Sequence, residues 1–363
     1  MVALVPLAIW CLLLTARRGF WRVSKHFAQH ATGARSKSIA VVIPARDEAE
    51  HIGNTVSGLR AQDFHAPVHI LVVDDNSTDG TALAAQNAGA IVIAGKPLPP
   101  GWTGKLWALS QGVQEAETYG SDFLLFTDAD ITHDRGSLSE LVAIAESGNY
   151  DLTSFMVKLA CRTFAERALI PAFVFFFLLL YPPGNPSTVG AAGGCILIRP
   201  EALRRIGGIS AIGQEVIDDC ALANAVKRHG GRVWMGLTNN RRSERSYATF
   251  REIGSMISRT AFNQLNHSAL LLLGTILGLV VMYLLPLAVL FSGRPVVVLL
   301  GAASWLLMAA AYLPMVRFYK LTPLWSFALP FVAMFYAGAT IHSAIQYWSG
   351  RGGYWKGRAQ DLS

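Results

Sequence analysis

Residues 68–80 read VHILVVDDNSTDG, and this stretch decides the fold class. Its first half, Val68 to Val73, is apolar and has the length of a buried strand. The second half is rich in Asp, Asn, Ser and Gly, which favour turns because they hydrogen-bond their own backbone or accept a positive φ. A helical pattern from Thr81 to Ala88 follows at once. The stretch therefore predicts a strand–turn–helix unit of an α/β domain.

The same alternation extends on both sides of this unit. Further apolar runs predict strands, and the segments between them predict helices over 47–62 and 105–119; the strands are expected at 39–43, 90–94 and 122–127. Strands that alternate with helices at these lengths are typical of a parallel sheet with crossover helices. We therefore expect an α/β domain over 38–237, with a mostly parallel twisted sheet and flanking helices.

The remainder of the chain has the composition of a membrane protein. Of 363 residues, 52% are hydrophobic and only 15% are charged, against about 25% charged in soluble domains. Three uncharged stretches, 269–291, 296–316 and 321–350, are each long enough for a membrane helix of about 20 residues. We expect an N-terminal anchor (1–20), a juxtamembrane basic segment (238–268), transmembrane helices (269–348) and a basic tail (349–363). The apolar stretch 170–181 is short and flanked by proline, which favours a re-entrant or interfacial helix.

The positive charges constrain the topology. Arg17, Arg18 and Arg22 follow the N-terminal apolar run rather than precede it, which favours an uncleaved anchor over a signal peptide. The expected location is the inner membrane, with several spans and the α/β domain in the cytoplasm. Three C-terminal spans would then place Arg351, Lys356 and Arg358 on the outer side, against the positive-inside tendency. Either one segment is re-entrant or the tail is an exception.

The net charge of +7 fits an anionic membrane surface or a phosphate-bearing substrate. We expect no nucleic-acid partner, because no helix-turn-helix, zinc-finger or RNA-binding signature is present. The four cysteines are too widely spaced in the sequence for a metal-binding pair.

Acidic residues follow three of the expected strands: Asp47-Glu48, Asp74-Asp75, and Asp128 with Asp130. A fourth cluster is Asp218-Asp219. Each alone could be a polar turn. In an open parallel sheet, however, the first three would meet at the carboxyl ends of the strands, where ligands bind. Carboxylates gathered there repel one another unless a cation is present, and a hard divalent metal shared with substrate phosphates would relieve this.

The two common phosphate-binding loops are absent from the sequence. No GxGxxG follows the first strand, and the residues before Gly104-Lys105 do not fit a P-loop. Basic side chains would therefore meet phosphate, and Lys105 is one candidate, with a solvated lysine as the alternative. The basic stretch from Arg241 to Arg251, together with Arg259, either faces anionic lipid or supplies an arginine to a diphosphate.

Taken together, these motifs resemble those of family 2 glycosyltransferases with the GT-A fold. They occur in the order typical of that family and extend over roughly 38–237: VVIPARDE, ILVVDDNSTDGT, GKLWAL, LLFTDADI, GAAGGCILIRPEALRRIGG and EVIDDCAL. With its membrane segments, the whole chain is most similar to the bacterial hopanoid-biosynthesis-associated group. It is also similar to ceramide-glucosyltransferase-type enzymes.

The resemblance implies where a nucleotide-sugar donor would bind. Pro44, Ala45 and Glu48 would line the nucleotide pocket. Asp75 would contact the uracil or ribose of a UDP-sugar, with Asp74 beside it. Lys105 stays a candidate for the phosphates.

The resemblance also implies the reacting groups. Asp128 and Asp130 would form a DxD motif that binds Mn²⁺ or Mg²⁺, with Asp130 the more direct ligand. Asp219 would be the general base, and Asp218 stands where many relatives have Glu. Two glycines would let the backbone approach the sugar and the acceptor: Gly193 and Gly194.

One departure from the family narrows the function. Many relatives that act on lipids or build polysaccharides carry Gln-x-x-Arg-Trp before the membrane helices, and here only Arg259 matches. This argues against a polysaccharide synthase and leaves Arg259 as a possible diphosphate contact. The expected function is inverting transfer of a sugar to a lipid acceptor, in hopanoid biosynthesis by resemblance. The alternatives are transfer to polyprenyl phosphate and nucleotide-sugar binding without turnover.

Overall fold

The computed structural model describes residues 2–16, 19–23, 37–185, 188–351, 354–355 and 358–359. Arg17, Arg18 and most of the expected tail, including Lys356, lie outside the described residues. The chain forms two compact units. We call Ser24–Leu159, Pro186–Arg245 and Tyr354–Ser363 the sheet unit. The helical unit comprises Met1–Val23, Ala160–Asn185 and Ser246–Gly353.

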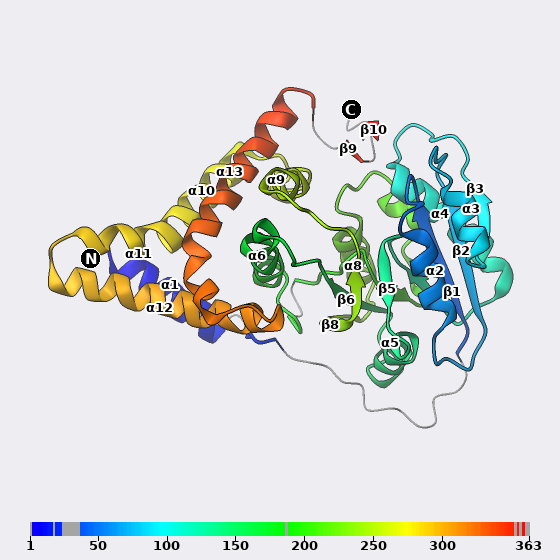
Figure 1. Cartoon of the computed structure of the whole chain (residues 1–363), viewed down its shortest axis with the longest axis horizontal. Coiled ribbons are helices and arrows are strands. Elements are labelled where there is room, and N and C mark those ends of the chain that lie inside the picture. The colour runs from blue at the N-terminus through cyan, green and yellow to red at the C-terminus, as the bar shows by residue number, and fades with distance from the viewer. Residues whose placement is uncertain are drawn as a thin grey trace. The chain divides into compact units, whose positions relative to one another are not determined.

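Among the described residues, the sheet unit holds an eight-stranded sheet in the order β3-β2-β1-β4-β7-β6-β8-β5 (Figure 1). Its strands are β1 (Ile39–Ala45), β2 (Val68–Asp74), β3 (Ile91–Ala94), β4 (Phe123–Phe126), β5 (Ile131–His133), β6 (Leu152–Lys158), β7 (Ile196–Ile198) and β8 (Val233–Ser243). β1 to β4 are mutually parallel, as expected. β7 is antiparallel to β4 and β6, β5 is antiparallel to β8, and β6 is parallel to β8.

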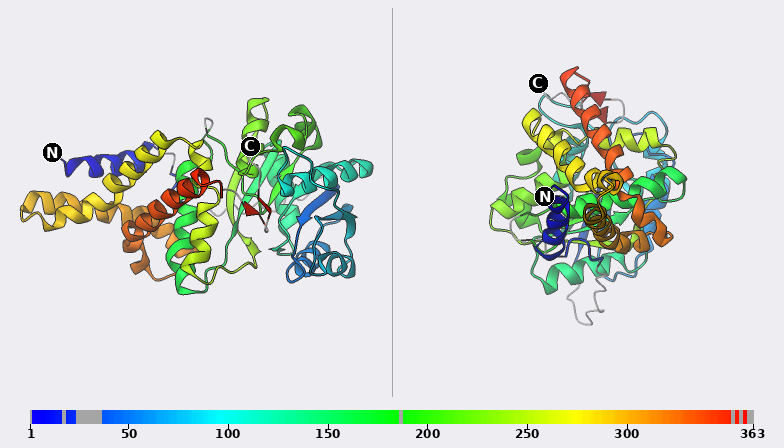
Figure 2. Two further views of the ribbon diagram at one scale, coloured as in Figure 1. Left: turned by 90° about the horizontal axis from the view of Figure 1, so that it is seen from above. Right: turned by 90° about the vertical axis from the view of Figure 1, so that its left-hand side faces the viewer.

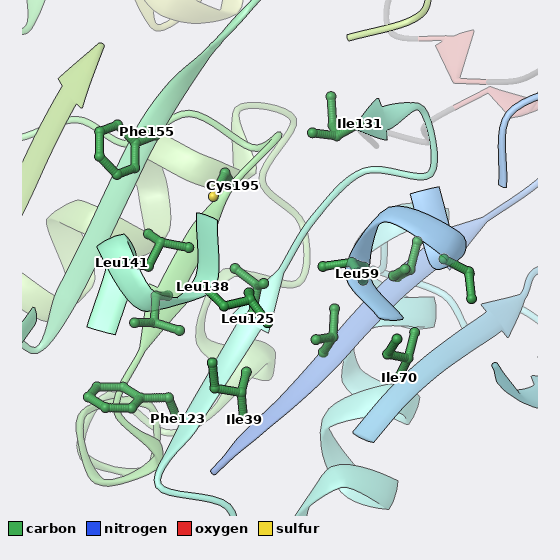
Figure 3. Packing of buried hydrophobic residues seen from close by; sticks show 14 of the residues in the cluster. Ile39, Leu59, Ile70, Phe123, Leu125, Ile131, Leu138, Leu141, Phe155 and Cys195 are labelled. Atoms are coloured by element: carbon green, nitrogen blue, oxygen red, sulfur yellow. The ribbon is translucent and has the colours of Figure 1, made fainter. Parts of the chain in front are cut away.

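Helices cover both faces of this sheet, and alternate residues of β1 show why. Ile39 and Val41 belong to one buried apolar cluster, and Ala40 and Val42 to another. Figure 3 shows the first cluster, in which residues of α5 pack beside Phe123, Leu125 and Phe155. A strand that is buried on both faces reads as a continuous apolar run. The helices of the unit are α2 (Ile52–Arg60), α3 (Thr81–Asn87), α4 (Gly104–Ala116), η1 (Glu117–Tyr119), α5 (Ser137–Ser147), α7 (Pro200–Arg205), η2 (Ile209–Ile212) and α8 (Asp218–Arg228).

The sheet continues further along the chain than the sequence indicated. β8 runs to Ser243, so residues 238–243 of the expected juxtamembrane segment belong to the sheet. Arg241 is fully buried there, forms an ion pair with Glu140 at 3.0 Å, and lies over the ring of Phe155. A buried charge needs such a partner. The cluster of arginines is therefore divided between the protein interior and its surface.

The helical unit contains three helices that are long and apolar enough to cross a membrane: Ala269–Phe291, Pro295–Phe318 and Pro323–Trp348. α1 (Leu4–Ala16) lies alongside α12, and its Trp10 Nε1 donates to the carbonyl of Met282 at 3.1 Å (Figure 2). The other helices are α6 (Phe164–Leu180), α9 (Phe250–Ser258), η3 (Asn263–Leu265), α10 (Ala269–Leu279), a π-helical turn (Val280–Leu284), α11 (Leu285–Ala288), η5 (Val289–Phe291), α12 (Pro295–Phe318), η6 (Pro323–Ala328) and α13 (Leu329–Trp348).

α6 contains the apolar stretch 170–181 and begins earlier than expected. Thr163 and Glu166 form a capping box, which satisfies the free N–H groups of the first turn. Most of its apolar residues are buried within the helical unit, where α6 contacts α9, α12 and α13.

Candidate active site

The three strands that precede the acidic motifs are neighbours in the sheet. β1 lies between β2 and β4, with Ala45 opposite Asp74 and Val42 opposite Phe126. All three are parallel, so their carboxyl ends lie at one edge. The register therefore brings Asp74-Asp75 and the Asp128 loop to the same rim, as the sequence predicted.

Lys105 joins this rim to the Asp218-Asp219 pair. It lies in the first turn of α4, whose N-cap is Thr103. Its Nζ is 3.0 Å from Asp128 Oδ1 and 3.0 Å from Asp218 Oδ2. Burial disfavours the charge of Lys105, but the two carboxylates outweigh it and raise its pKa above the ordinary value. Lys105 is thus a cation held between two acids that lie far apart in the sequence.

Gly193 lies beside the side chains of Lys105, Asp128 and Asp219. Its N–H donates to Asp219 Oδ2 at 2.9 Å. A Cβ at this position would lie 3.1 Å from Lys105 Nζ and 3.6 Å from Asp219 Oδ2. A larger residue would therefore crowd the groups that surround the site. At Gly194 a Cβ would instead lie 2.9 Å from a side-chain carbon of Val157, so this glycine permits close packing in the core.

Asp219 lies in the first turn of α8. Its Oδ1 accepts a hydrogen bond from the N–H of Cys220 at 2.7 Å. Burial, and then the neighbouring charge of Asp218, raise the pKa of Asp219 to about 6, although Lys105 and the two N–H donors oppose the rise. A carboxylate with a pKa near neutrality is suited to accept and release a proton.

Asp130 is the second carboxylate with a raised pKa. Burial and the charge of Asp128 raise it, while Arg245 and Ser243 oppose the rise. Asp130 Oδ2 accepts from Ser243 Oγ at 2.8 Å and lies 3.4 Å from Arg245 Nε. Arg245 also forms an ion pair with the buried Glu48. The side chain of Glu48 thus contacts the partner of Asp130.

Asp130 and Asp128 would supply part of the ligand shell of a divalent cation, and a bound substrate would supply the rest. Among the described residues, no three His, Cys, Asp or Glu side chains converge in a way that could hold a metal alone. Mg²⁺ commonly takes only one or two carboxylates and completes its shell with water and substrate phosphate. Burial is the largest cause of the raised pKa of Asp130, and a bound cation would offset part of the cost of burying its charge.

A second polar cluster surrounds the end of β2. Asp75 is almost completely buried, and its carboxylate lies 3.7 Å from Arg46 NH1. The same nitrogen donates to the Asp75 carbonyl at 2.6 Å. Asp74 Oδ1 accepts from the N–H of Ser77, which holds the turn after the strand. Asp75 is therefore fixed by Arg46.

A pocket in the sheet unit is lined by many of the predicted residues, among them Pro44, Lys105, Asp128, Gly193 and Asp218. Ala45 is buried and accepts the N–H of Asp75. Arg259 lies at the end of α9 in the helical unit, so its role at the diphosphate stays a prediction.

Several polar residues of the site were not singled out in the sequence. Arg46 lies in the VVIPARDE motif, but the sequence predicted no role for it. Ser243 and Arg245 lie in the basic stretch from Arg241 to Arg251, and the sequence did not distinguish them from its other residues. Thr127 precedes Asp128, and its hydroxyl donates to the Gly194 carbonyl at 2.8 Å while contacting His133 Nε2 at 3.2 Å. It thereby connects the loop of Asp128 with the turn of Gly193. The position of Thr127 directly after β4 is the sequence signal that could have identified it as a residue of the site.

Comparison with known proteins finds similarity to glycosyltransferases. Residues 40–207 match the family model described as glycosyl transferase family 2. A 97-residue stretch is 39% identical to 4,4'-diaponeurosporenoate glycosyltransferase of Staphylococcus aureus strain bovine RF122 / ET3-1, covering 26% of this chain and 24% of the relative. The protein of strain MRSA252 is 38% identical over the same length and share. The chain thus matches about a quarter of the length of these relatives.

The fold is also similar to that of a solved structure. This is the mannosyltransferase PcManGT from Pyrobaculum calidifontis, in complex with GDP-Man and Mn²⁺. The TM-score is 0.58 at 16% identity, and the similarity covers 96% of this chain and 98% of the other. Residues 40–207 of the chain are thus similar to glycosyl transferase family 2, and the fold of the chain is the mixed α/β GT-A fold.

Proposed function

We propose that this chain is a membrane-bound inverting glycosyltransferase that moves a sugar from a nucleotide-sugar to the hydroxyl of a lipid. The observation that carries the proposal is the position of Lys105, 3.0 Å from both Asp128 and Asp218. This contact brings the expected donor-binding loop within one side chain of the expected base. A direct displacement requires such closeness, because donor and acceptor must meet in one step.

On the donor side, the residues at the rim would bind a nucleoside diphosphate. Pro44, Ala45, Glu48 and the Asp74-Asp75 turn would hold the nucleotide, with UDP as the proposed donor. Asp130, with Asp128, would hold Mn²⁺ or Mg²⁺, and a bound metal supplies Lewis-acid stabilisation of the leaving diphosphate. Ser243 and Arg245 orient the Asp130 carboxylate. Lys105 lies where it could meet the phosphate charge.

On the acceptor side, Asp219 would remove the proton of the attacking hydroxyl. The N–H groups of Gly193 and Cys220 fix its carboxylate at the start of α8. The oxygen of the acceptor forms a bond to the anomeric carbon as the bond to the diphosphate breaks, and the proton passes to Asp219. Because one displacement occurs, the anomeric configuration inverts and no covalent intermediate is formed.

The acceptor is proposed to be a lipid alcohol, for three reasons. The helical unit has three helices that could cross a membrane. The relatives in S. aureus are named 4,4'-diaponeurosporenoate glycosyltransferases, which supports a lipid-type acceptor. The resemblance to the hopanoid-associated group suggests a hopanoid or another isoprenoid-derived lipid. The cytoplasmic side of the inner membrane is the proposed place of the reaction.

The test is to incubate membranes that contain the protein with a panel of UDP-sugars, with GDP-mannose as the competing donor, in Mn²⁺, Mg²⁺ or EDTA. Lipid extracts are analysed by mass spectrometry, and the anomeric configuration of the product is read by NMR. We expect a metal-dependent glycolipid from a UDP-sugar with inverted configuration. A retained configuration, or a product made only from GDP-mannose, would refute the mechanism or the donor, respectively.

Two variants separate the alternatives. Asp219→Asn should abolish transfer to an alcohol but spare transfer to polyprenyl phosphate, whose nucleophile is already anionic. A protein that only binds nucleotide-sugar would release no UDP in any condition. Asp63→Asn, an exposed carboxylate outside the rim, is the matched control and should behave as the wild type.

A further inference from the structure

The last apolar helix, α13, is long enough to be a third span, but its two ends lie at unusual places within the helical unit. Only Tyr319 to Thr322 separate the end of α12 from η6, which leads directly into α13. Trp305 of α12 donates to the carbonyl of Phe327 at 3.1 Å, which fixes η6 beside α12. Trp305 lies in the middle of α12, so η6 folds back along the second half of α12 and α13 starts beside the middle of that helix.

The other end of α13 lies beside the beginning of α10. Tyr347 stacks on His267 with ring centroids 4.0 Å apart, and Trp348 contacts Phe262 at 5.3 Å. The N–H of Phe262 donates to Ser343 Oγ at 3.0 Å. Phe262 and His267 lie just before Ala269, the first residue of α10. The C-terminal end of α13 is thus held at the entrance of α10.

α10, α11 and α12 form a hairpin whose tip is Ser292–Arg294. Near the tip the two arms pack tightly, since a Cβ at Gly301 would lie 2.7 Å from the carbonyl of Pro286. Figure 1 shows the arms diverging from the tip, with α13 running from beside α12 to the start of α10. If both arms cross the membrane, their free ends lie on one side of it, and α13 returns from the middle of α12 to that side.

From this geometry we propose that α13 does not cross the membrane but lies in the leaflet at the open end of the hairpin, with its exposed face against acyl chains. That face is a regular apolar stripe at helical spacing: Phe331, Met334, Ile341, Ile345 and Trp348, each between 41% and 58% exposed. α13 also carries the exposed His342, and its mean hydropathy of 1.6 is below the 2.5 and 2.2 of the other two candidates. An ionisable group is costly at the bilayer centre and is tolerated near the interface.

α6 supports the same placement. Both of its flanks return to the sheet unit, so α6 begins and ends on one side of the membrane. It packs against the middle of α13, where Tyr336 Oη donates to the carbonyl of Leu169 at 3.0 Å.

The placement also resolves the conflict in the charges. With α13 in the leaflet, the tail returns to the side on which α10 begins. The described basic residues that flank the membrane segments then share that side: Arg22, Arg317, Lys320 and Arg351. Arg294, at the tip of the hairpin, would lie opposite. This distribution follows the positive-inside tendency, which three spans would break.

The first test compares single cysteines in the full chain, after replacement of the four native ones. Ser292→Cys marks the tip of the hairpin, Ser349→Cys the end of α13, and Gln86→Cys the sheet unit. A membrane-impermeant maleimide is applied to intact and to opened cells. We expect Ser349→Cys to label with Gln86→Cys and opposite to Ser292→Cys, whichever side holds the sheet unit. Labelling of Ser292→Cys and Ser349→Cys from the same side would overturn the proposal.

A second test measures how deep the exposed face of α13 lies in the membrane. Nitroxide labels at Phe331→Cys and Ile345→Cys lie 14 residues apart on the exposed stripe, which corresponds to about 21 Å of helix. A helix in the plane of the leaflet gives the two labels similar oxygen and nickel accessibilities. A third label at Met334→Cys, between them, keeps a similar depth in that arrangement. In a crossing helix this third label lies deeper than both end labels, and that result would exclude the proposal. Reporter fusions after Ser363 give an independent reading of the side of the tail.

Discussion

The site contains two carboxylate pairs, Asp128 with Asp130 and Asp218 with Asp219. The two pairs share the same arrangement around Lys105 but are held by different kinds of hydrogen-bond donor. In each pair, one acid contacts Lys105 and the other has a raised pKa. Asp130 is held by side chains, from Ser243 and Arg245. Asp219 is held by backbone N–H groups. Side chains can turn aside when a cation binds, whereas backbone donors stay in place. This difference supports the proposal of metal binding at the first pair and proton transfer at the second.

The largest expected effect is that of Asp219→Asn. The variant keeps the size of the side chain but cannot accept the proton, so kcat should fall by about 10²- to 10⁴-fold with donor KM little changed. The measurement is steady-state UDP release at saturating acceptor. Asp218→Asn is the companion variant and should lose less. A larger loss in Asp218→Asn would reverse the roles within this pair.

Asp130→Asn should come next. Loss of a metal ligand removes several kcal/mol of stabilisation from the leaving diphosphate, which corresponds to about a 10³-fold loss in rate. Mn²⁺ binding in the presence of UDP, followed by electron paramagnetic resonance, should weaken in parallel. Ser243→Ala removes only a hydrogen bond to the same oxygen and should show a smaller loss of Mn²⁺ affinity. Unchanged Mn²⁺ binding in Asp130→Asn would remove this residue from the metal site.

Lys105→Met tests the contact that joins the two pairs. Hydrogen bonds to charged groups contribute about 1.5–3 kcal/mol each, so kcat/KM should fall by about 10- to 100-fold. Lys105 also lowers the pKa of Asp219, so the acidic limb of the pH–rate profile should move to higher pH in this variant. Lys105→Arg retains the charge and should retain the wild-type limb. An unmoved limb in Lys105→Met would mean that the two pairs act independently.

The pH dependence of the wild type follows from the sign of the shift at Asp219. The raised pKa of about 6 means that the base is increasingly protonated as pH falls below 6. The rate should therefore decrease about tenfold per pH unit below that value. It should be flat between about pH 7 and 8. A limb near pH 4 would indicate that a carboxylate with an ordinary pKa carries the reaction.

The smallest effect is expected for Thr127→Val, which preserves shape and removes the hydroxyl between the two pairs. The loss of its hydrogen bond to Gly194 should lower the free energy of unfolding by about 1 kcal/mol. Thr127→Ser keeps the hydroxyl and should retain more of this stability. Chemical denaturation monitored by tryptophan fluorescence gives the comparison.

The sequence reveals one half of the sheet much better than the other. β1, β2 and β4 are continuous apolar runs because helices cover them on both faces. β5 and β7 are three residues long, and β8 ends in Asn, Asn, Arg, Arg and Ser. Such segments lack the periodicity that predicts a strand. The burial of Arg241 in β8 depends on its ion pair with Glu140, which is 101 residues away in the sequence. Pairing of this kind is invisible in a local pattern.

The site follows the same rule. Asp128, Asp130 and Asp219 were predicted because they follow a strand or stand in a family motif. Arg245 was recognised only as part of a basic stretch, because its partners Glu48 and Asp130 are brought to it by the sheet. The sequence indicated which acids are present, but the cations opposite them come from tertiary structure.

The hydrogen bonds of Glu166 determine when the start of α6 can finish folding during synthesis. It is completely buried, and its carboxylate completes the capping box of α6 while also accepting from Ser246 Oγ and the N–H of Tyr247, both at 2.8 Å. Burial opposes its charge, yet these hydrogen bonds lower the pKa of Glu166 below the ordinary value. The two later donors are made 80 and 81 residues after Glu166, which takes the ribosome about 4–16 s at about 5–20 residues per second. The start of α6 is therefore completed only after the last strand of the sheet has been translated.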